Sequence, residues 1–203
     1  MKSQIIFFDL DDTLVNTRQT ILRRINLLLD KYPFDITSQY IYRLLGSSER
    51  ESILARKIGE KTLFWDDYEA LRKNITVDSI SGANTLLETL VSKRKNIGII
   101  TDNTCQKTLI KLQSAKINPA LFNGNIYSCS EKSCLKPSVG IISYLRVNPK
   151  KILYIGDDLI DYEFARNSGI GFYGVCTGEH SREDFIENGL NRSRIFPSVK
   201  EIV

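Results

Sequence analysis

The chain has 203 residues, of which 42% are hydrophobic and 26% charged, and its formal net charge at pH 7 is +4. A chain of this length can bury a sizeable core, as one domain with a small additional lobe. No stretch approaches the roughly 20 apolar residues of a membrane-spanning helix, and the basic residues lack the clustering typical of nucleic-acid binders. We therefore expect a cytoplasmic monomer or homodimer that binds neither membranes nor nucleic acids.

Apolar runs typical of buried parallel strands recur along the chain, separated by segments with helical periodicity. These runs lie near residues 4–8, 96–101, 125–129, 151–155 and 170–175. Continuous apolar character indicates strands that are covered on both faces. The alternation predicts an α/β fold with a Rossmann-like parallel sheet between two layers of helices, a three-layer αβα core.

The segment between the first two strands is too long for a single crossover helix. Apolar residues recur in it at intervals of three and four, from Ile21 to Leu29 and from Phe64 to Ile75. This spacing indicates amphipathic helices. We predict a small all-helical cap domain at residues 17–78, inserted into a core domain made of residues 1–16 and 79–203.

Acidic and hydroxyl residues stand where three of the predicted strands end. Asp9 and Asp11 follow the first apolar run, Thr101 ends the second, and Asp157 follows the run that ends at residue 155. Because the carboxyl ends of parallel strands meet at one edge of a sheet, these side chains are expected to converge. Oxygen ligands without nearby Cys or His favour Mg²⁺. Alternatively, Asp11 and Asp12 only shape a turn or cap a helix.

Four motifs in order along the chain resemble the signatures of the haloacid dehalogenase-like superfamily of phosphohydrolases. They are Asp9-Leu10-Asp11-Asp12-Thr13-Leu14, then Thr101, then Lys136 before Pro137, and finally Gly156-Asp157-Asp158-x-x-Asp161. Residues 169–178 also resemble the last core strand of the phosphoglycolate phosphatase-like branch. The resemblance covers nearly the whole chain. It implies a Mg²⁺-dependent phosphatase of a small phosphorylated metabolite, with a moving cap inserted after the first strand.

The resemblance also implies a role for each motif residue. Asp9 would be the nucleophile that forms an aspartyl-phosphate, and Asp11 the general acid and base. Asp9, the main-chain carbonyl of Asp11 and Asp157 would bind Mg²⁺. Thr101 and Lys136, together with the amide that follows Thr101, would bind the phosphate oxygens.

Three further residues carry less direct expectations. Asp102 stands where this branch commonly has Asn, so we expect its side chain to turn away from the phosphate and only its amide to bind. Asp158 either caps the following helix or, with Asp161, supports the metal and Lys136. Arg50 belongs to a loop, residues 46–50, that resembles the family's specificity loop, and it would contact the substrate through a carboxylate or a second phosphate.

Several alternatives remain at this stage. A phosphomutase of the β-phosphoglucomutase type shares every core residue with a phosphatase, and the cap decides whether water or a sugar hydroxyl attacks the intermediate. A receiver-like signalling module would need an acidic phosphoacceptor after the third strand, but residues 126–130 contain no acid. A dehalogenase would need neither Asp11 nor Asp157. A non-hydrolytic binding module would be expected to have lost at least one motif.

Overall fold

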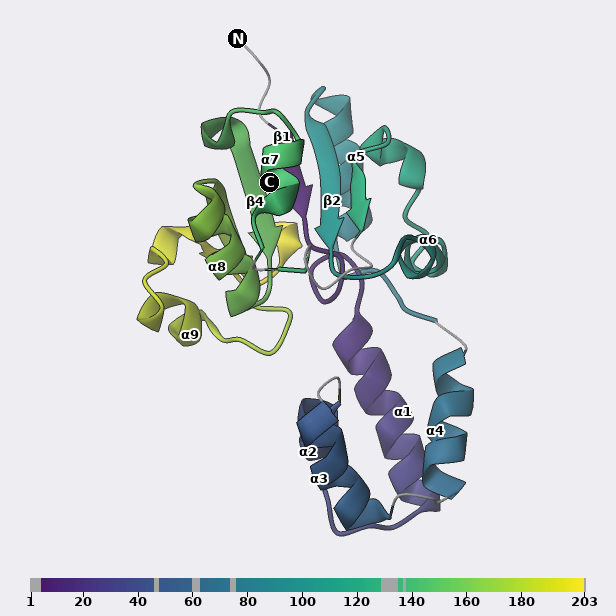
Figure 1. The fold of residues 1–203 in the computed structure, drawn as a ribbon. Coiled ribbons are helices and arrows are strands. Elements are labelled where there is room, and N and C mark those ends of the chain that lie inside the picture. Colours follow the sequence, from purple (N-terminus) through teal and green to yellow (C-terminus); the bar gives the residue numbers. More distant parts are fainter. Residues whose placement is uncertain are drawn as a thin grey trace. The chain divides into compact units, whose positions relative to one another are not determined.

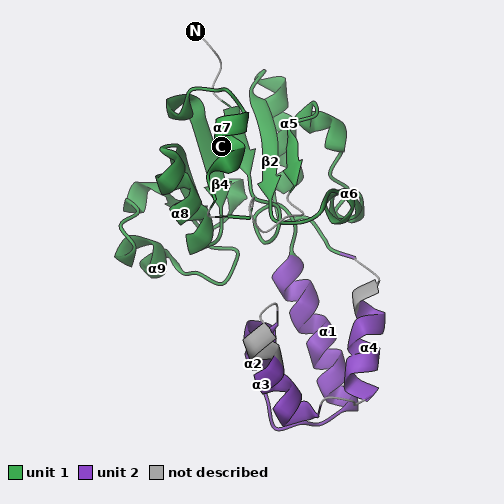
Figure 2. Cartoon of the chain, viewed as in Figure 1, with its two compact units in different colours: residues 1–16, 77–203 green, residues 17–76 purple. Residues whose placement is uncertain are grey.

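The chain forms two compact units in a computed structural model that describes residues 5–45, 48–59, 63–73, 76–128, 135–136 and 138–202. Unit 1 consists of residues 1–16 and 77–203, and unit 2 of residues 17–76 (Figure 2). The second boundary lies two residues before the one expected from the sequence.

A parallel sheet forms the centre of unit 1 (Figure 1). Its strands lie in the order β3-β2-β1-β4-β5-β6, and every neighbouring pair is parallel. Because β1 is central, its carboxyl end is flanked by those of β2 and β4, where open α/β sheets bind ligands. The strands are β1 (Ile5–Phe8), β2 (Asn96–Thr101), β3 (Ile126–Ser128), β4 (Ile152–Gly156), β5 (Gly171–Val175) and β6 (Ile195–Phe196).

Helices cover both faces of this sheet. In β1, Ile6 and Phe8 belong to one buried cluster while Phe7 belongs to another, as the alternation of side chains along a strand requires. The first cluster includes residues of α5 (Ala83–Ser92) and α6 (Cys105–Ser114), and the second includes residues of α7 (Gly140–Tyr144), α8 (Leu159–Ser168) and α9 (Arg182–Glu187). The predicted three-layer αβα core is therefore confirmed. Short 3₁₀ turns join these elements at η1 (Pro119–Phe122), η3 (Pro149–Lys151), η4 (Arg192–Arg194) and η5 (Val199–Ile202).

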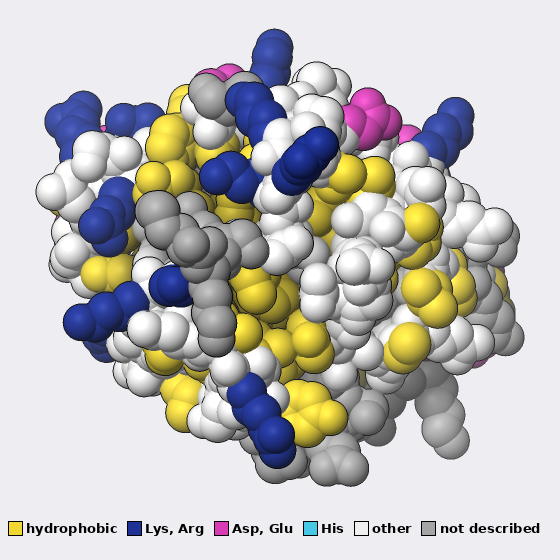
Figure 3. All heavy atoms as spheres, turned by 90° about the horizontal axis from the view of Figure 1, so that it is seen from above, with side chains coloured by type: hydrophobic (Ala, Val, Ile, Leu, Met, Phe, Trp, Pro, Cys, Tyr) yellow, Lys and Arg dark blue, Asp and Glu magenta, His cyan; other side chains and the backbone are white. Residues whose placement is uncertain are grey.

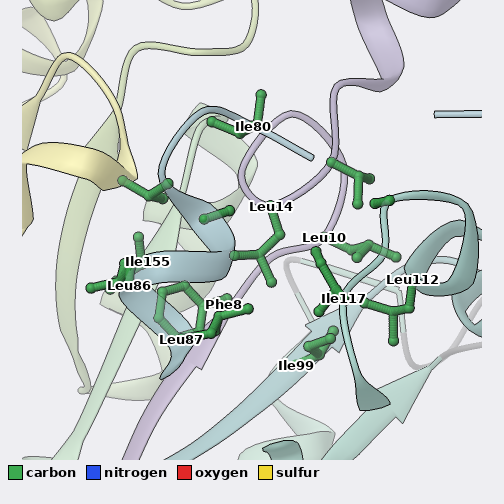
Figure 4. Packing of buried hydrophobic residues seen from close by; sticks show 14 of the residues in the cluster. Phe8, Leu10, Leu14, Ile80, Leu86, Leu87, Ile99, Leu112, Ile117 and Ile155 are labelled. Atoms are coloured by element: carbon green, nitrogen blue, oxygen red, sulfur yellow. The ribbon is translucent and has the colours of Figure 1, made fainter. Parts of the chain in front are cut away.

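The loop after β1 is fixed to the core by its leucines. Leu10 and Leu14 are fully buried and point into the cluster shown in Figure 4. The carbonyl of Leu10 accepts hydrogen bonds from the amides of Leu14 and Val15, each at 3.0 Å. Asp12 has φ = 55°, a left-handed conformation that Asp tolerates better than most residues. The acidic residues of this loop therefore stand on a rigid turn rather than on a flexible one.

Unit 2 is all-helical in its described part and has a hydrophobic core of its own. Its helices are α1 (Thr17–Lys31), α2 (Ser38–Leu44), α3 (Ser48–Ile58) and α4 (Leu63–Lys73). The periodic apolar residues of the sequence supply its centre, and the buried ones are Ile25, Leu28, Ile41, Leu54, Ile58, Phe64 and Tyr68. Phe64 packs edge-on against Trp65, with ring centroids 5.2 Å apart. A core built from its own helices lets this insertion fold as a separate unit.

The distribution of side chains on the surface is consistent with the modest net positive charge of the chain. Figure 3 shows one face of the molecule, on which Lys and Arg side chains are interspersed with hydrophobic and uncharged ones. In the part of the chain that the structure describes, no helix combines the length and the apolar character that crossing a bilayer would require. The expectations of a cytoplasmic location and of no nucleic-acid partner stay predictions.

Candidate active site

The carboxyl ends of the central strands bring polar residues from distant parts of the sequence together. Asp9 follows β1, Thr101 ends β2, and Asp157 follows β4, and all three are buried. The amide of Asp9 donates to the carbonyl of Ile155 at 2.8 Å, which extends the pairing of β1 with β4 beyond the last strand residue. The backbone of the sheet therefore carries these side chains to one place in unit 1.

Lys136 enters the same place from the segment between β3 and α7. Its ammonium donates to Asp9 Oδ1 at 2.6 Å, to Asp161 Oδ1 at 2.5 Å and to the Tyr154 hydroxyl at 3.0 Å. An ammonium has three N–H bonds, so each finds an acceptor. The carboxylate of Asp102 accepts a hydrogen bond from the Lys136 amide at 3.0 Å. The Asp102 side chain thus holds the backbone of Lys136.

The carboxyl groups of Asp9, Asp157 and Asp161 are buried close together, and Lys136 binds two of them. Burial raises the pKa of Asp9 to about 8, against the lowering effect of Lys136 and with further increases from Asp161 and Asp11. Burial also raises the pKa of Asp157 well above its ordinary value, and Asp161 and Asp9 add to this increase. For Lys136, burial by itself lowers the pKa, but Asp161 and Asp9 raise it well above the usual range. The site therefore favours an additional positive charge.

Asp157 is enclosed by two loops. The Thr13 hydroxyl donates to Asp157 Oδ1 at 2.7 Å. Gly178, which follows β5, approaches so closely that a Cβ atom built on it would overlap Asp157 Oδ2. The neighbouring Thr177 donates its hydroxyl to the carbonyl of Asp12 at 2.5 Å and so ties this loop to the one after β1. Only glycine fits at position 178 without displacing the carboxylate.

Asp11 is held by two donors from the segment that follows β2. Lys111 Nζ donates to Asp11 Oδ1 and Asn103 Nδ2 donates to Asp11 Oδ2, both at 2.5 Å. Lys111 also donates to Asn103 Oδ1 at 3.1 Å, which closes a triangle of three side chains. Asn103 Nδ2 also donates to Thr101 Oγ1 at 2.9 Å. Asn103 therefore joins the Asp11 carboxylate to the Thr101 hydroxyl.

Asp158 and Asp161 begin α8. The Asp158 side chain accepts a hydrogen bond from the amide of Ile160 at 2.8 Å, and Asp161 Oδ2 accepts one from the amide of Asp158 at 3.2 Å. Together they form a capping box, which satisfies amides that the first turn of a helix leaves without partners. Asp158 thus caps the helix, whereas Asp161 both caps it and binds Lys136.

A comparison with models of protein families identifies the chain. The model of the haloacid dehalogenase-like hydrolases matches residues 6–175, a range that contains all four motifs. The chain belongs to the haloacid dehalogenase-like hydrolase family. This assignment makes it an enzyme and favours a hydrolase over a receiver-like or binding module. No curated protein sequence matches this hydrolase significantly.

Solved structures share the fold of this hydrolase over almost its whole length. A haloacid dehalogenase family hydrolase from Deinococcus radiodurans with bound phosphate and sodium has a TM-score of 0.81 at 19% identity, covering 98% of this chain and 93% of that one. A candidate β-phosphoglucomutase from Thermotoga maritima has a TM-score of 0.78 at 21% identity, covering 98% and 96%. A predicted phosphoglycolate phosphatase from Haemophilus somnus has a TM-score of 0.75 at 22% identity, covering 100% and 97%.

The acidic residues of this hydrolase fit a divalent metal ion. Asp9, Asp157 and Asp161 each offer a carboxylate oxygen, and these oxygens lie within 4.8 Å of one another. A donor set made only of oxygen suits a hard cation such as Mg²⁺. Burial, with a smaller effect from the neighbouring carboxylates, raises the pKa of both Asp9 and Asp157, and a bound cation would favour their ionised forms. Asp161 was expected beside the metal ligands and lies close enough to join them.

Sequence reasoning assigned no role to several side chains that contact the motif residues, among them Asn103, Lys111 and Tyr154. One signal for Lys111 was available, because it lies next to Leu112 on the buried side of α6, where an isolated lysine needs a partner. Tyr154 similarly places a hydroxyl inside an otherwise apolar strand. The side chain of Arg50, expected to contact the substrate, lies outside the part of the chain that the structure describes.

Proposed function

We propose that this hydrolase is a Mg²⁺-dependent phosphatase that acts on a small phosphorylated metabolite through an aspartyl-phosphate on Asp9. The observation that carries the proposal is the convergence of Asp9, Thr101, Lys136 and Asp157 at one edge of the sheet. This set combines a carboxylate nucleophile, donors for an anion and oxygen ligands for a cation. Phosphoryl transfer needs these three elements together.

Lys136 and Thr101 would bind the phosphate oxygens of the substrate. Thr101 Oγ1 accepts hydrogen bonds from the amide and the side chain of Asn103, so its own O–H bond is available to donate. Lys136 is buried among acidic groups, and a phosphate oxygen near Asp9 would share its positive charge. The Asp102 side chain is engaged with the Lys136 backbone, which leaves the amide of Asp102 as its donor to the phosphate.

In the first step, a carboxylate oxygen of Asp9 attacks phosphorus and the bond between phosphorus and the leaving oxygen breaks. Asp11 begins this step in its protonated form and transfers its proton to that leaving oxygen. In the second step, a water molecule attacks the phosphorus of the aspartyl-phosphate while Asp11 takes up a proton from the water. The bond between phosphorus and Asp9 then breaks, which releases phosphate and restores both carboxyl groups.

Asp9, Asp157 and the main-chain carbonyl of Asp11 would hold Mg²⁺, and Asp161 lies close enough to support them. When bound, the ion supplies positive charge that lets an anionic carboxylate approach an anionic phosphate. Gly178 contributes by leaving the Asp157 carboxylate undisturbed. We propose that unit 2 is a cap that selects the substrate, because the core residues recognise only the phosphate group.

Two substitutions test the assignment of roles. Asp9→Asn should abolish phosphate release while the protein keeps its thermal melting transition, because the amide is a poor nucleophile of nearly the same size. Full activity in this variant would remove Asp9 as the nucleophile. Asp157→Ala should raise the Mg²⁺ concentration needed for half-maximal activity. An unchanged Mg²⁺ titration would remove Asp157 from the ligand set.

A substrate screen tests the reaction itself. The screen contains phosphoglycolate, pyrophosphate, nucleoside monophosphates and β-glucose 1-phosphate, each assayed with Mg²⁺. Phosphoglycolate is the first substrate to test because the Haemophilus somnus relative is described as a phosphatase of this compound. Release of free phosphate supports a phosphatase. Conversion of β-glucose 1-phosphate to an isomeric sugar phosphate without phosphate release would instead indicate a phosphomutase.

A further inference from the structure

Lys111 is a buried lysine that belongs to none of the four motifs. Its side chain is only 11% exposed, and its ammonium donates to Asp11 Oδ1 and to Asn103 Oδ1. Lysine is rarely buried without a charged partner, because its ammonium loses hydration there. The partner in this protein is the carboxylate that the proposed reaction uses as general acid and base.

The helix that carries Lys111 is capped at one end and packed into the core at the other. The Thr104 side chain caps α6 by accepting a hydrogen bond from the amide of Lys107. Leu112 and Ala115 anchor its other end in the core of unit 1. Lys107 lies one turn before Lys111 on the same helix, and its side chain is exposed. Of these two lysines, Lys111 is the one that donates a hydrogen bond to the loop after β1.

Each oxygen of the Asp11 carboxylate accepts a hydrogen bond from a different side chain. Lys111 binds Oδ1 and Asn103 binds Oδ2, while Asn103 is itself fixed by its hydrogen bond to Thr101. The Asp11 backbone is set by the buried leucines on either side of it in the loop, but those leucines leave the rotation of the carboxyl group undetermined. Asn103 in the loop between β2 and α6 and Lys111 in α6 restrict that rotation.

We propose that Lys111, together with Asn103, is a positioning residue that orients the Asp11 carboxyl group for proton transfer to the leaving oxygen. The inference rests on the proposed phosphatase function and adds to it a residue outside the family motifs. General acid catalysis contributes roughly 10²- to 10⁴-fold to a rate, and it requires the acid to lie within hydrogen-bonding distance of the proton acceptor. A misdirected carboxyl group would lose part of that factor.

The test compares two esters whose leaving groups differ in their need for a proton. The leaving group of p-nitrophenyl phosphate departs readily as an anion, whereas that of phenyl phosphate depends more strongly on protonation. The measured quantity is kcat/KM with Mg²⁺, because it reports the step in which the leaving oxygen departs even when hydrolysis of the aspartyl-phosphate limits kcat. Asp11→Asn serves as the reference for full loss of the acid.

Lys111→Met removes the charge while keeping most of the side-chain volume. We expect kcat/KM for phenyl phosphate to fall by about 10- to 100-fold and that for p-nitrophenyl phosphate by less than about threefold, a part of the full acid contribution. Lys111→Arg should recover part of the loss, because it restores a cationic donor. Asn103→Ala should show the same difference between the two esters. Lys107→Met is the matched control and should behave as the wild type.

The outcomes separate the inference from the function on which it rests. Equal losses of kcat/KM on both esters in Lys111→Met, or no loss on either, would overturn the positioning role, provided that Asp11→Asn discriminates between the esters. Retained turnover of p-nitrophenyl phosphate in Lys111→Met shows that the variant is folded. A wild-type protein that hydrolyses neither ester would overturn the phosphatase function and the inference with it.

Discussion

The hydroxyl group of Tyr154 offers a stringent test of how the site is held together. Tyr154 is fully buried, and burial raises the pKa of its hydroxyl well above the ordinary value, so the group keeps its proton. Its oxygen lies 3.0 Å from Lys136 Nζ, 3.0 Å from the Ile100 carbonyl and 3.2 Å from Asp161 Oδ1. Lys136 donates to this oxygen, so the single O–H bond of Tyr154 is left for the Ile100 carbonyl or Asp161 Oδ1, and the Ile100 carbonyl is the nearer acceptor. Tyr154→Phe therefore deletes one donated and one accepted hydrogen bond.

The expected loss follows from these two bonds. A hydrogen bond between neutral groups contributes about 1 kcal/mol to stability, and one to a charged group about 1.5–3 kcal/mol. We expect the free energy of unfolding of unit 1 to fall by about 3 kcal/mol, since the phenyl ring stays in place. At about 3 °C per kcal/mol for a chain of this size, the melting temperature should drop by about 9 °C.

Calorimetry is the suitable assay because the only tryptophan, Trp65, lies in unit 2 and its fluorescence would not report directly on unit 1. Tyr173→Phe is the matched control. Tyr173 lies in β5 of the same sheet and packs against Phe196, and among the described residues its hydroxyl has no hydrogen-bond partner. Melting temperatures of the two variants that agree within about 2 °C would refute the reasoning.

Substitutions at three further positions test other parts of the structure. Gly98→Ala should destabilise unit 1 by about 1–3 kcal/mol in urea unfolding, because a Cβ atom there would lie 2.7 Å from the carbonyl oxygen of Asn125. Unchanged stability would mean that β2 and the segment before β3 move apart freely. Asp158→Ala should cost about 1 kcal/mol through loss of the α8 cap, whereas Asp158→Asn should cost less. Gly178→Ala should weaken Mg²⁺ binding in calorimetric titrations, because the added methyl group displaces the Asp157 carboxylate; equal affinity would contradict that contact.

Much of the fold could be predicted from the sequence because strand periodicity and burial are local properties. The continuous apolar run of β1 indicated a strand covered on both faces, and the structure has helices on both sides of it. The strand β6 was missed, because its two residues, Ile195 and Phe196, are too few to form a pattern. Unit 2 ends at residue 76, two residues before the end expected for the helical insertion, and no strong sequence signal marks the return to the sheet.

In the site, too, the residues that depend on local sequence could be predicted. Asp9, Thr101 and Asp157 could be found because each ends a parallel strand, and parallel strands place such residues at one edge whatever surrounds them. The oxygens of Asp9 and Asp157 lie within 4.8 Å of each other, as a shared ion requires. The family motifs also named Lys136 and Asp161, although their direct ion pair is visible only in three dimensions.

The contacts of Asn103, Lys111 and Tyr154 depend instead on how elements cross in space. Lys111 meets Asp11 across 100 positions of the sequence, because α6 packs against the sheet at one particular angle and depth. No local pattern encodes that angle, which results from the packing of many side chains at once. Local chemistry thus specified which groups the protein carries at its strand ends, and only the packed core decided which neighbours hold them in place.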